Sequence, residues 1–277
     1  MKVNYYLLIF IMLFVFILNS KCAKQIELSS KWRDSEIFID GIDNEWGSAT
    51  IYVAKAKVSI TLINDNQDLY IRLCSRDRQV HAQVLGMGLT IWFDPDGGKE
   101  KTLGIRFPLG MKDTPMMTRT REGDQGERLQ KMLEESTNEL EILRSDGEEI
   151  NRILLTEAKT HGIDVKMGFS RGNLVYELKV PLIQDEEHLY AIDIDTPEAD
   201  AGPLIGIGFE TPEFSMKEMR EKMEEGGTGM PGEGPPPGGD RMPGGVRGGG
   251  PPGGIDKAER LNLWTKVQLA SMPSVQD

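Results

Sequence analysis

The residues that could perform acid–base, nucleophilic or metal chemistry are few and scattered in this chain. Its three histidines are His81, His161 and His188, and none has a nucleophile motif or a second ligand at metal-binding spacing nearby. The sequence Glu-Glu-His at 186–188 is not a zinc motif. The 44 acidic residues offer many carboxylate pairs for a glycosidase, but no flanking pattern selects one pair. We therefore predict no catalytic residues and no enzyme activity.

The sequence Asp-Pro-Asp-Gly-Gly at 94–98 is the strongest candidate for a metal site. Asp94 and Asp96 could lend two carboxylate oxygens to calcium, a hard cation that binds oxygen ligands in turns. The alternative is an Asx turn that holds no metal, because an Asp side chain readily accepts hydrogen bonds from backbone N–H groups two residues on. We predict no cofactor, with calcium at Asp94 and Asp96 as the candidate exception.

Short strands must position these residues, because apolar residues recur with a period of two along much of the chain. A polar turn at 64–67 and the turn at 94–98 predict two hairpins. The alternating segments are 57–63, 68–74, 89–94, 102–110, 174–182, 205–210 and 261–270. Helical patterns are limited to 79–85, 123–135 and 212–225, and they do not recur between strands. We predict an all-β fold: a two-sheet antiparallel β-sandwich, jelly-roll or immunoglobulin-like, with a few short surface helices.

Composition and charge predict one domain and exclude one class of partner. The formal net charge of −12 and the absence of a Lys/Arg cluster argue against nucleic-acid binding. A Gly/Pro-rich tract at 226–254, in which 21 of 29 residues are Gly or Pro, is expected to be a disordered loop. Because a strand pattern follows this tract, we predict a single sandwich domain over 35–270, with a partly helical insertion at 111–139 and a tail at 271–277.

The first 22 residues have the layout of an export signal: one Lys, an apolar run from Tyr5 to Leu18, then small and polar residues. The apolar run is shorter than the roughly 20 residues that span a bilayer. Cys22 lies where a lipoprotein carries its acylated cysteine, although Lys21 precedes it where a small residue is usual, so acylation and simple cleavage both stay open. We predict export to the periplasm, outer membrane or cell surface, with residues 23–34 as a tether and a lipid anchor at Cys22 as one contact with the membrane.

Three segments resemble the carbohydrate-binding module family 9 and the related DOMON-like sandwiches. They are IFIDGIDNEW (37–46), NDNQDLYIRLCSRD (64–77) and LTIWFDPDGG (89–98), in the order and spacing of that family. The amphipathic strand LVYELKVPL (174–182) also fits. The resemblance implies a β-sandwich, saccharide binding, and in some members bound calcium. Trp46 is expected to cover an open end of the sandwich rather than to bind ligand.

Saccharide binding would require aromatic rings on the strand faces opposite the core, with polar groups beside them. Trp92, Trp264 and Tyr70 occupy such positions, and Arg72 shares the strand face of Tyr70. These four residues are the predicted ligand-binding residues. The alternative is that they lie beneath a loop or face another layer.

The function predicted from the sequence is a non-catalytic exported module that binds saccharide or glycan at the cell envelope. One alternative is a structural or protein-interaction domain of the envelope, whose Gly/Pro-rich tract serves as a flexible spacer. A less favoured alternative is haem binding, since some DOMON-like relatives hold haem through Met and His or Lys. Met87 and His81 are close in sequence, but no c-type attachment motif is present.

Overall fold

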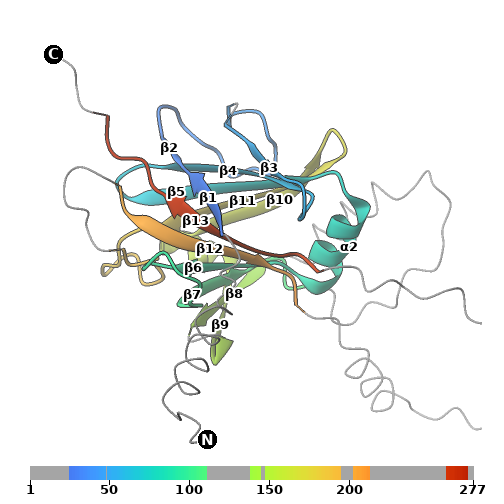
Figure 1. Ribbon diagram of the computed structural model, residues 1–277. Coiled ribbons are helices and arrows are strands. Elements are labelled where there is room, and N and C mark those ends of the chain that lie inside the picture. Colours follow the sequence, from blue (N-terminus) through green and yellow to red (C-terminus); the bar gives the residue numbers. More distant parts are fainter. Residues whose placement is uncertain are drawn as a thin grey trace, which may run out of the picture.

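Two β-sheets packed face to face make up the fold (Figure 1). The computed structural model describes residues 25–47, 49–110, 138–144, 147–194, 202–212 and 260–273. The predicted all-β, two-sheet sandwich is confirmed. Most strand pairs are antiparallel, but β1 with β13 and β2 with β4 are parallel, so each sheet is mixed.

The seven-stranded sheet brings together strands that are far apart in sequence. Its central strand β6 pairs with β7, the next strand along the chain, and with β12, more than a hundred residues later. The strand order across the sheet is β1 (Ile26–Ser29), β13 (Asn262–Gln268), β12 (Leu204–Glu210), β6 (Thr90–Asp94), β7 (Leu103–Arg106), β8 (Glu139–Arg144) and β9 (Glu149–Leu154). The predicted strands at 89–94, 102–110, 205–210 and 261–270 all lie here.

The six-stranded sheet is built around the hairpin of β4 and β5. The turn between these strands is closed by Asp65, whose Oδ1 accepts the backbone N–H groups of Gln67 and Asp68, both at 2.8 Å. The order is β10 (Asp164–Ser170), β11 (Asn173–Pro181), β5 (Asp68–Ser75), β4 (Val58–Asn64) and β2 (Lys31–Trp32). A short strand, β3 (Ile51–Val53), pairs with the other end of β4.

The core lies between the two sheets and takes every second residue of each strand, as the period of two requires. On β5 the inward residues are Leu69, Ile71 and Leu73, and on β6 they are Ile91 and Phe93; all five are fully buried. Burial of each such side chain stabilises the fold by about 1.5–3 kcal/mol. The outward residues of the same strands are therefore the ones available for a site.

Two helices appear in the described residues: α2 (Arg78–Met87) and α4 (Leu155–Thr160). Helix α2 lies at one end of the sandwich (Figure 1) and buries Val80 and Val84 against the core. Asp77 caps it, since its Oδ1 accepts the backbone N–H groups of residues 79 and 80. None of the helices among these residues has the length and apolar character needed to cross a membrane.

The segment expected to be a tether, 23–34, is instead partly structured. Residues 26–29 form β1, which pairs with β13, and residues 31–32 form β2. The physical reason is the alternation of Ile26 and Leu28 with polar residues: Leu28 enters the core and covers the edge of β13. The tether prediction is therefore wrong for residues 26–32.

Several sequence predictions fall outside the described residues. They are the export signal at 1–22 with Cys22, nearly all of the insertion at 111–139, the Gly/Pro-rich tract at 226–254 and the last four residues of the tail. The expected helices at 123–135 and 212–225 also fall there, apart from residue 212.

Candidate functional site

A buried carboxylate on β11 anchors the segment 37–46 to the outer face of the six-stranded sheet. Glu177 Oε2 accepts the backbone N–H groups of Asp40 at 2.9 Å and Gly41 at 2.7 Å. Its Oε1 accepts the indole N–H of Trp46 at 2.8 Å. The segment that resembles the family motif thus lies flat on the sheet, and Trp46 is buried as a cover, in agreement with the sequence interpretation.

Two opposing effects act on the carboxyl of Glu177. Burial penalises its charged form, whereas the three N–H donors favour that form. Burial is the larger effect and raises the pKa of Glu177 to about 7. The anchor of the 37–46 segment is therefore a group that titrates near neutral pH.

The anchored segment also needs a close approach between two backbones. Gly41 has φ of +82°, and a Cβ at this position would lie 3.1 Å from the backbone nitrogen of Gly168 on β10. A Cβ at Gly168 would in turn lie 2.6 Å from the carbonyl oxygen of Gly41. Glycine at both positions is what lets the segment lie against the strand.

A groove with a volume of about 790 Å³ opens on this same outer face. Its floor comes from the outward residues of β4 and β5, and its walls come from β3, from residue 43 of the anchored segment and from the ends of β5 and β11. The lining residues are Asp43, Thr50, Tyr52, Ala54, Lys57, Ser59, Arg72, Cys74, Ser75, Arg76, Asp77 and Asn173. The volume lies within the range of about 300–1,000 Å³ that is usual for small-molecule sites.

Arg72 lies in the floor of the groove and is held by several contacts. Its Nη2 donates to Thr50 Oγ1 at 2.8 Å and to Thr61 Oγ1 at 2.9 Å, and its Nη1 donates to the backbone oxygen of Asp43 at 3.4 Å. The guanidinium carbon lies 5.7 Å from the ring centre of Trp46, a cation–π contact. The Nε–H is buried and has no hydrogen-bond partner among the described residues. The arginine is thus fixed in position with one donor unused.

The rim of the groove carries an exposed aromatic ring and further charges. Tyr52 on β3 is 63% exposed. Lys57 Nζ forms an ion pair with Asp77 Oδ2 at 2.7 Å. Arg76 Nε donates to Asn173 Oδ1 at 2.8 Å, which joins the ends of β5 and β11. Sequence reasoning missed Tyr52, because a three-residue edge strand shows too little alternation to be recognised.

Cys74 also lines the floor, between Arg72 and the strand end. Burial raises the pKa of its thiol to about 11, so the thiol stays protonated at neutral pH. A protonated, buried thiol is a poor nucleophile and contributes to the floor as a small apolar group.

The four predicted ligand-binding residues do not meet on one surface. Tyr70 and Arg72 point outward from β5 in the six-stranded sheet, whereas Trp92 and Trp264 point outward from β6 and β13 in the seven-stranded sheet. The whole thickness of the sandwich separates the two pairs. Trp92 is 5% exposed and Tyr70 is 3% exposed, so of the four only Arg72 lines the groove.

Trp92 and Trp264 each lie over a glycine of the neighbouring strand. A Cβ at Gly104 would lie 2.6 Å from Cζ3 of Trp92, and a Cβ at Gly208 would lie 2.6 Å from Cε2 of Trp264. Trp264 Nε1 donates to Glu210 Oε1 at 2.9 Å. The indoles thus fill the space that missing side chains leave on the outer face of the sheet, which is a packing role.

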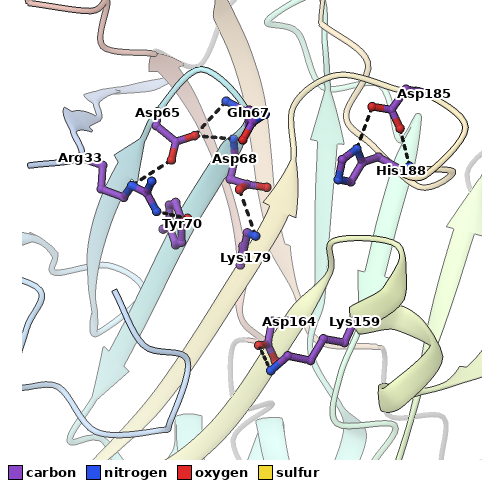
Figure 2. A network of polar contacts seen from close by, with 10 residues as sticks. All are labelled: Arg33, Asp65, Gln67, Asp68, Tyr70, Lys159, Asp164, Lys179, Asp185 and His188. Carbon is purple, nitrogen blue, oxygen red and sulfur yellow. Dashed lines mark hydrogen bonds and ion pairs between the residues drawn. The ribbon is translucent and has the colours of Figure 1, made fainter. Parts of the chain in front are cut away.

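Tyr70 belongs to a polar network at the turn between β4 and β5 (Figure 2). Its hydroxyl accepts Arg33 Nη1 at 2.7 Å, and Arg33 Nε forms an ion pair with Asp65 at 2.9 Å. Burial, together with the charges of Asp68 and Asp65, raises the pKa of Tyr70 to about 12. In the same network Lys179 pairs with Asp68 at 3.0 Å. This network fastens Arg33 to the sheet and lies outside the groove.

The three histidines are hydrogen-bonded individually and are not gathered into a constellation. His81 Nε2 contacts the backbone oxygen of Ser75 at 2.8 Å, and His161 Nδ1 contacts that of Glu187 at 3.1 Å. His188 Nδ1 pairs with the exposed Asp185 at 2.9 Å (Figure 2). The haem candidates His81 and Met87 are six residues apart on α2, which places them on different sides of that helix.

The candidate calcium residues lie in the turn after β6. Asp94 is buried; its Oδ1 accepts the N–H of Asp96 at 3.0 Å, and its Oδ2 accepts the N–H of Glu100 at 2.7 Å. This is the geometry of an Asx turn. Within the described ranges, no three His, Cys, Asp or Glu side chains converge as metal ligands would. Calcium binding at Asp94 and Asp96 stays a prediction.

Comparison with known proteins gives a distant structural likeness. No protein-family model and no curated protein sequence matches the chain. Among solved structures, the chain is similar to a carbohydrate-binding module of family 9 from Caldicellulosiruptor kristjanssonii in complex with glucose, with TM-score 0.30, 11% identity, and coverage of 70% of this chain and 80% of that one. It is also similar to a module of that family and organism in complex with cellotriose, with TM-score 0.29, 11% identity, and coverage of 70% and 78%. A likeness at this level does not establish the family or the ligand of the chain.

Proposed function

We propose that this protein is a non-catalytic saccharide-binding module and that the groove on the six-stranded sheet is its binding site. The observation that carries the proposal is the combination, in one groove of about 790 Å³, of an exposed aromatic ring at Tyr52 and a fixed polar floor at Arg72. Saccharide sites combine such a ring, which covers sugar C–H groups, with hydrogen-bonding side chains beside it.

Each part of the groove has a defined role in this proposal. Tyr52 offers its ring to the sugar face. Arg72 forms the fixed polar floor, and Asn173 and Ser59 add groups that can donate to or accept from hydroxyls. No step of covalent chemistry is required of the residues in the groove. The module would hold a glycan without changing it.

The test is binding to a panel of immobilised polysaccharides and oligosaccharides, with Tyr52→Ala as the first variant. We expect binding to at least one glycan, and a loss of about tenfold or more in affinity on removal of the ring. The matched control is Phe38→Ala, since Phe38 is a comparably exposed aromatic (54%) that does not line the groove. Binding that Phe38→Ala weakens and Tyr52→Ala leaves intact would place the site elsewhere.

The proposal includes export, because residues 1–22 have the pattern of a secretory signal. In a bacterial host we expect the full chain to reach the envelope fraction. Metabolic labelling with a fatty acid would distinguish acylation at Cys22 from simple cleavage of the signal. Label that is lost in Cys22→Ser indicates a lipoprotein, whereas unlabelled soluble protein indicates simple cleavage. Retention of the full-length chain in the cytoplasm would remove this part of the proposal.

A further inference from the structure

The charges that line the groove differ from those of the chain as a whole. The chain has a formal net charge of −12, with 44 acidic and 32 basic residues. The groove, in contrast, is lined by three cations, Lys57, Arg72 and Arg76, and by two carboxylates, Asp43 and Asp77. The side chains that line the groove therefore carry a net positive formal charge, although the whole chain is acidic.

Only one of the three cations is neutralised by a neighbouring carboxylate. Lys57 is paired with Asp77 at 2.7 Å. Arg72 donates to two threonine hydroxyls and a backbone oxygen, and Arg76 donates to an amide oxygen. Among the described residues, neither arginine forms an ion pair. Two guanidinium groups in one groove thus lack a counter-charge.

The carboxylates nearest to Arg72 are occupied by other donors. Asp43 Oδ1 accepts the hydroxyl of Ser170 at 2.9 Å. Glu177 lies opposite Arg72 in the register of β11 and β5, but its two oxygens accept N–H groups of the 37–46 segment. Burial also favours the neutral form of that carboxyl. Neither of these carboxylates therefore forms an ion pair with Arg72, and Arg76 is the exposed guanidinium of the groove.

From this arrangement we infer that the groove takes an acidic saccharide, one that carries carboxylate or sulfate groups. The inference rests on the proposed saccharide-binding function and specifies its ligand class. A guanidinium binds carboxylate or sulfate oxygens through paired N–H donors, and charge-assisted bonds of this kind are stronger than those to neutral hydroxyls. Arg72 lies on β5 and Arg76 follows directly after the last residue of that strand, so the two arginines line the groove at two separate positions. Two cationic positions in one groove suit two anionic groups on one oligosaccharide.

The overall negative charge of the protein does not prevent this binding. At physiological ionic strength, charges farther than about 8 Å apart are largely screened from each other. An anionic group within hydrogen-bond distance of an arginine responds mainly to that arginine. The attraction between the anionic group and the arginine is itself weakened by salt, so the affinity for an acidic saccharide should fall as the ionic strength rises.

The experiment measures, by calorimetry, the affinity of the full chain for three probes of similar length: hexagalacturonate, a sulfated dextran oligosaccharide and cellohexaose. We expect the carboxylated or the sulfated probe to bind at least about tenfold more tightly than cellohexaose. Comparison of the two anionic probes shows whether a carboxylate or a sulfate is recognised. Added salt should weaken the anionic probe far more than cellohexaose.

The variant is Arg76→Gln, because Arg76 is exposed and the amide can still contact Asn173 without the charge. We expect a loss of about tenfold for the anionic probe and little change for cellohexaose. Arg144→Gln is the control, since it removes the same charge from the other sheet. Arg72→Lys, which keeps the charge but not the planar donors, tests the floor of the groove.

The outcomes separate this inference from the proposed function. Equal or tighter binding of cellohexaose, weakened by Tyr52→Ala, would overturn the acidic ligand and leave the saccharide-binding function standing. Binding of the anionic probe that Arg76→Gln and Arg144→Gln weaken equally would show non-specific attraction and would also overturn it. Absence of binding to all glycans would remove the proposed function itself.

Discussion

The buried Glu177 should give this protein a stability that falls as the pH rises toward neutrality. Burial raises its pKa from the ordinary 4.5 to about 7 in the folded chain. Between these two values the folded state holds a proton that the unfolded state has released. The stabilisation is complete below about pH 4.5 and is lost as the pH rises through about 7. A shift of this size corresponds to at most about 3 kcal/mol.

The perturbation that isolates this effect is Glu177→Gln, which cannot ionise. The amide keeps one acceptor oxygen but turns an NH₂ group toward either the Trp46 indole or the N–H groups of Asp40 and Gly41. A buried donor facing another donor costs about 1–3 kcal/mol, so the variant should be less stable at pH 5. As the pH rises to 8, the native protein loses the stabilisation that the protonated Glu177 provides. The difference in free energy of unfolding between the native protein and Glu177→Gln should therefore shrink.

The assay is urea unfolding followed by tryptophan fluorescence at pH 5, 6, 7 and 8, with the free energy of unfolding taken by linear extrapolation. Glu27→Gln is the control, because Glu27 is exposed on β1 and should change stability by less than about 0.5 kcal/mol at every pH. A difference between native protein and Glu177→Gln that widens as the pH rises would refute the reasoning. It would mean that the three N–H donors outweigh burial and hold the carboxylate charged.

Five further substitutions test packing and capping, each by the change in free energy of unfolding in urea. Gly104→Ala should destabilise the protein by about 1–3 kcal/mol, because the new Cβ would meet the Trp92 ring at 2.6 Å. Gly86→Ala is the control on α2, where nothing lies within 4 Å of the new Cβ, and it should stabilise the protein by about 0.5–1 kcal/mol. An equal effect at both glycines would contradict the stacking. Tyr176→Phe should be neutral or stabilising, since this buried hydroxyl has no hydrogen-bond partner among the described residues; a loss above about 1 kcal/mol would reveal a partner. Asp77→Ala should cost about 0.5–2 kcal/mol through loss of the α2 cap, and the unfolding of Asp77→Asn should stay close to native because the amide oxygen can still cap.

Sequence alternation was sufficient to predict seven of the strands and their two faces, namely β4, β5, β6, β7, β11, β12 and β13. It did not predict β8, β9 or β10. Leu69, Ile71 and Leu73 are in the core, and Tyr70 and Arg72 point outward, as the period of two requires. It failed where an element is short or its polar residues obscure the pattern. Residues 26–29 form a strand in a segment read as a tether, and β3 with Tyr52 gave no signal.

The sequence by itself determined the fold class, because alternation within a strand is a local property that each side chain carries. Only the tertiary structure decided the site. Alternation says that Tyr70, Arg72, Trp92 and Trp264 face away from the core, but it does not say which sheet each strand joins or what covers its outer face. Those depend on pairings over long separations, such as that of β5 with β11 about a hundred residues later. Long-range pairing placed the two tryptophans on the far sheet over glycines, buried Tyr70 beneath the N-terminal segment, and left Arg72 in a groove with Tyr52 and Arg76.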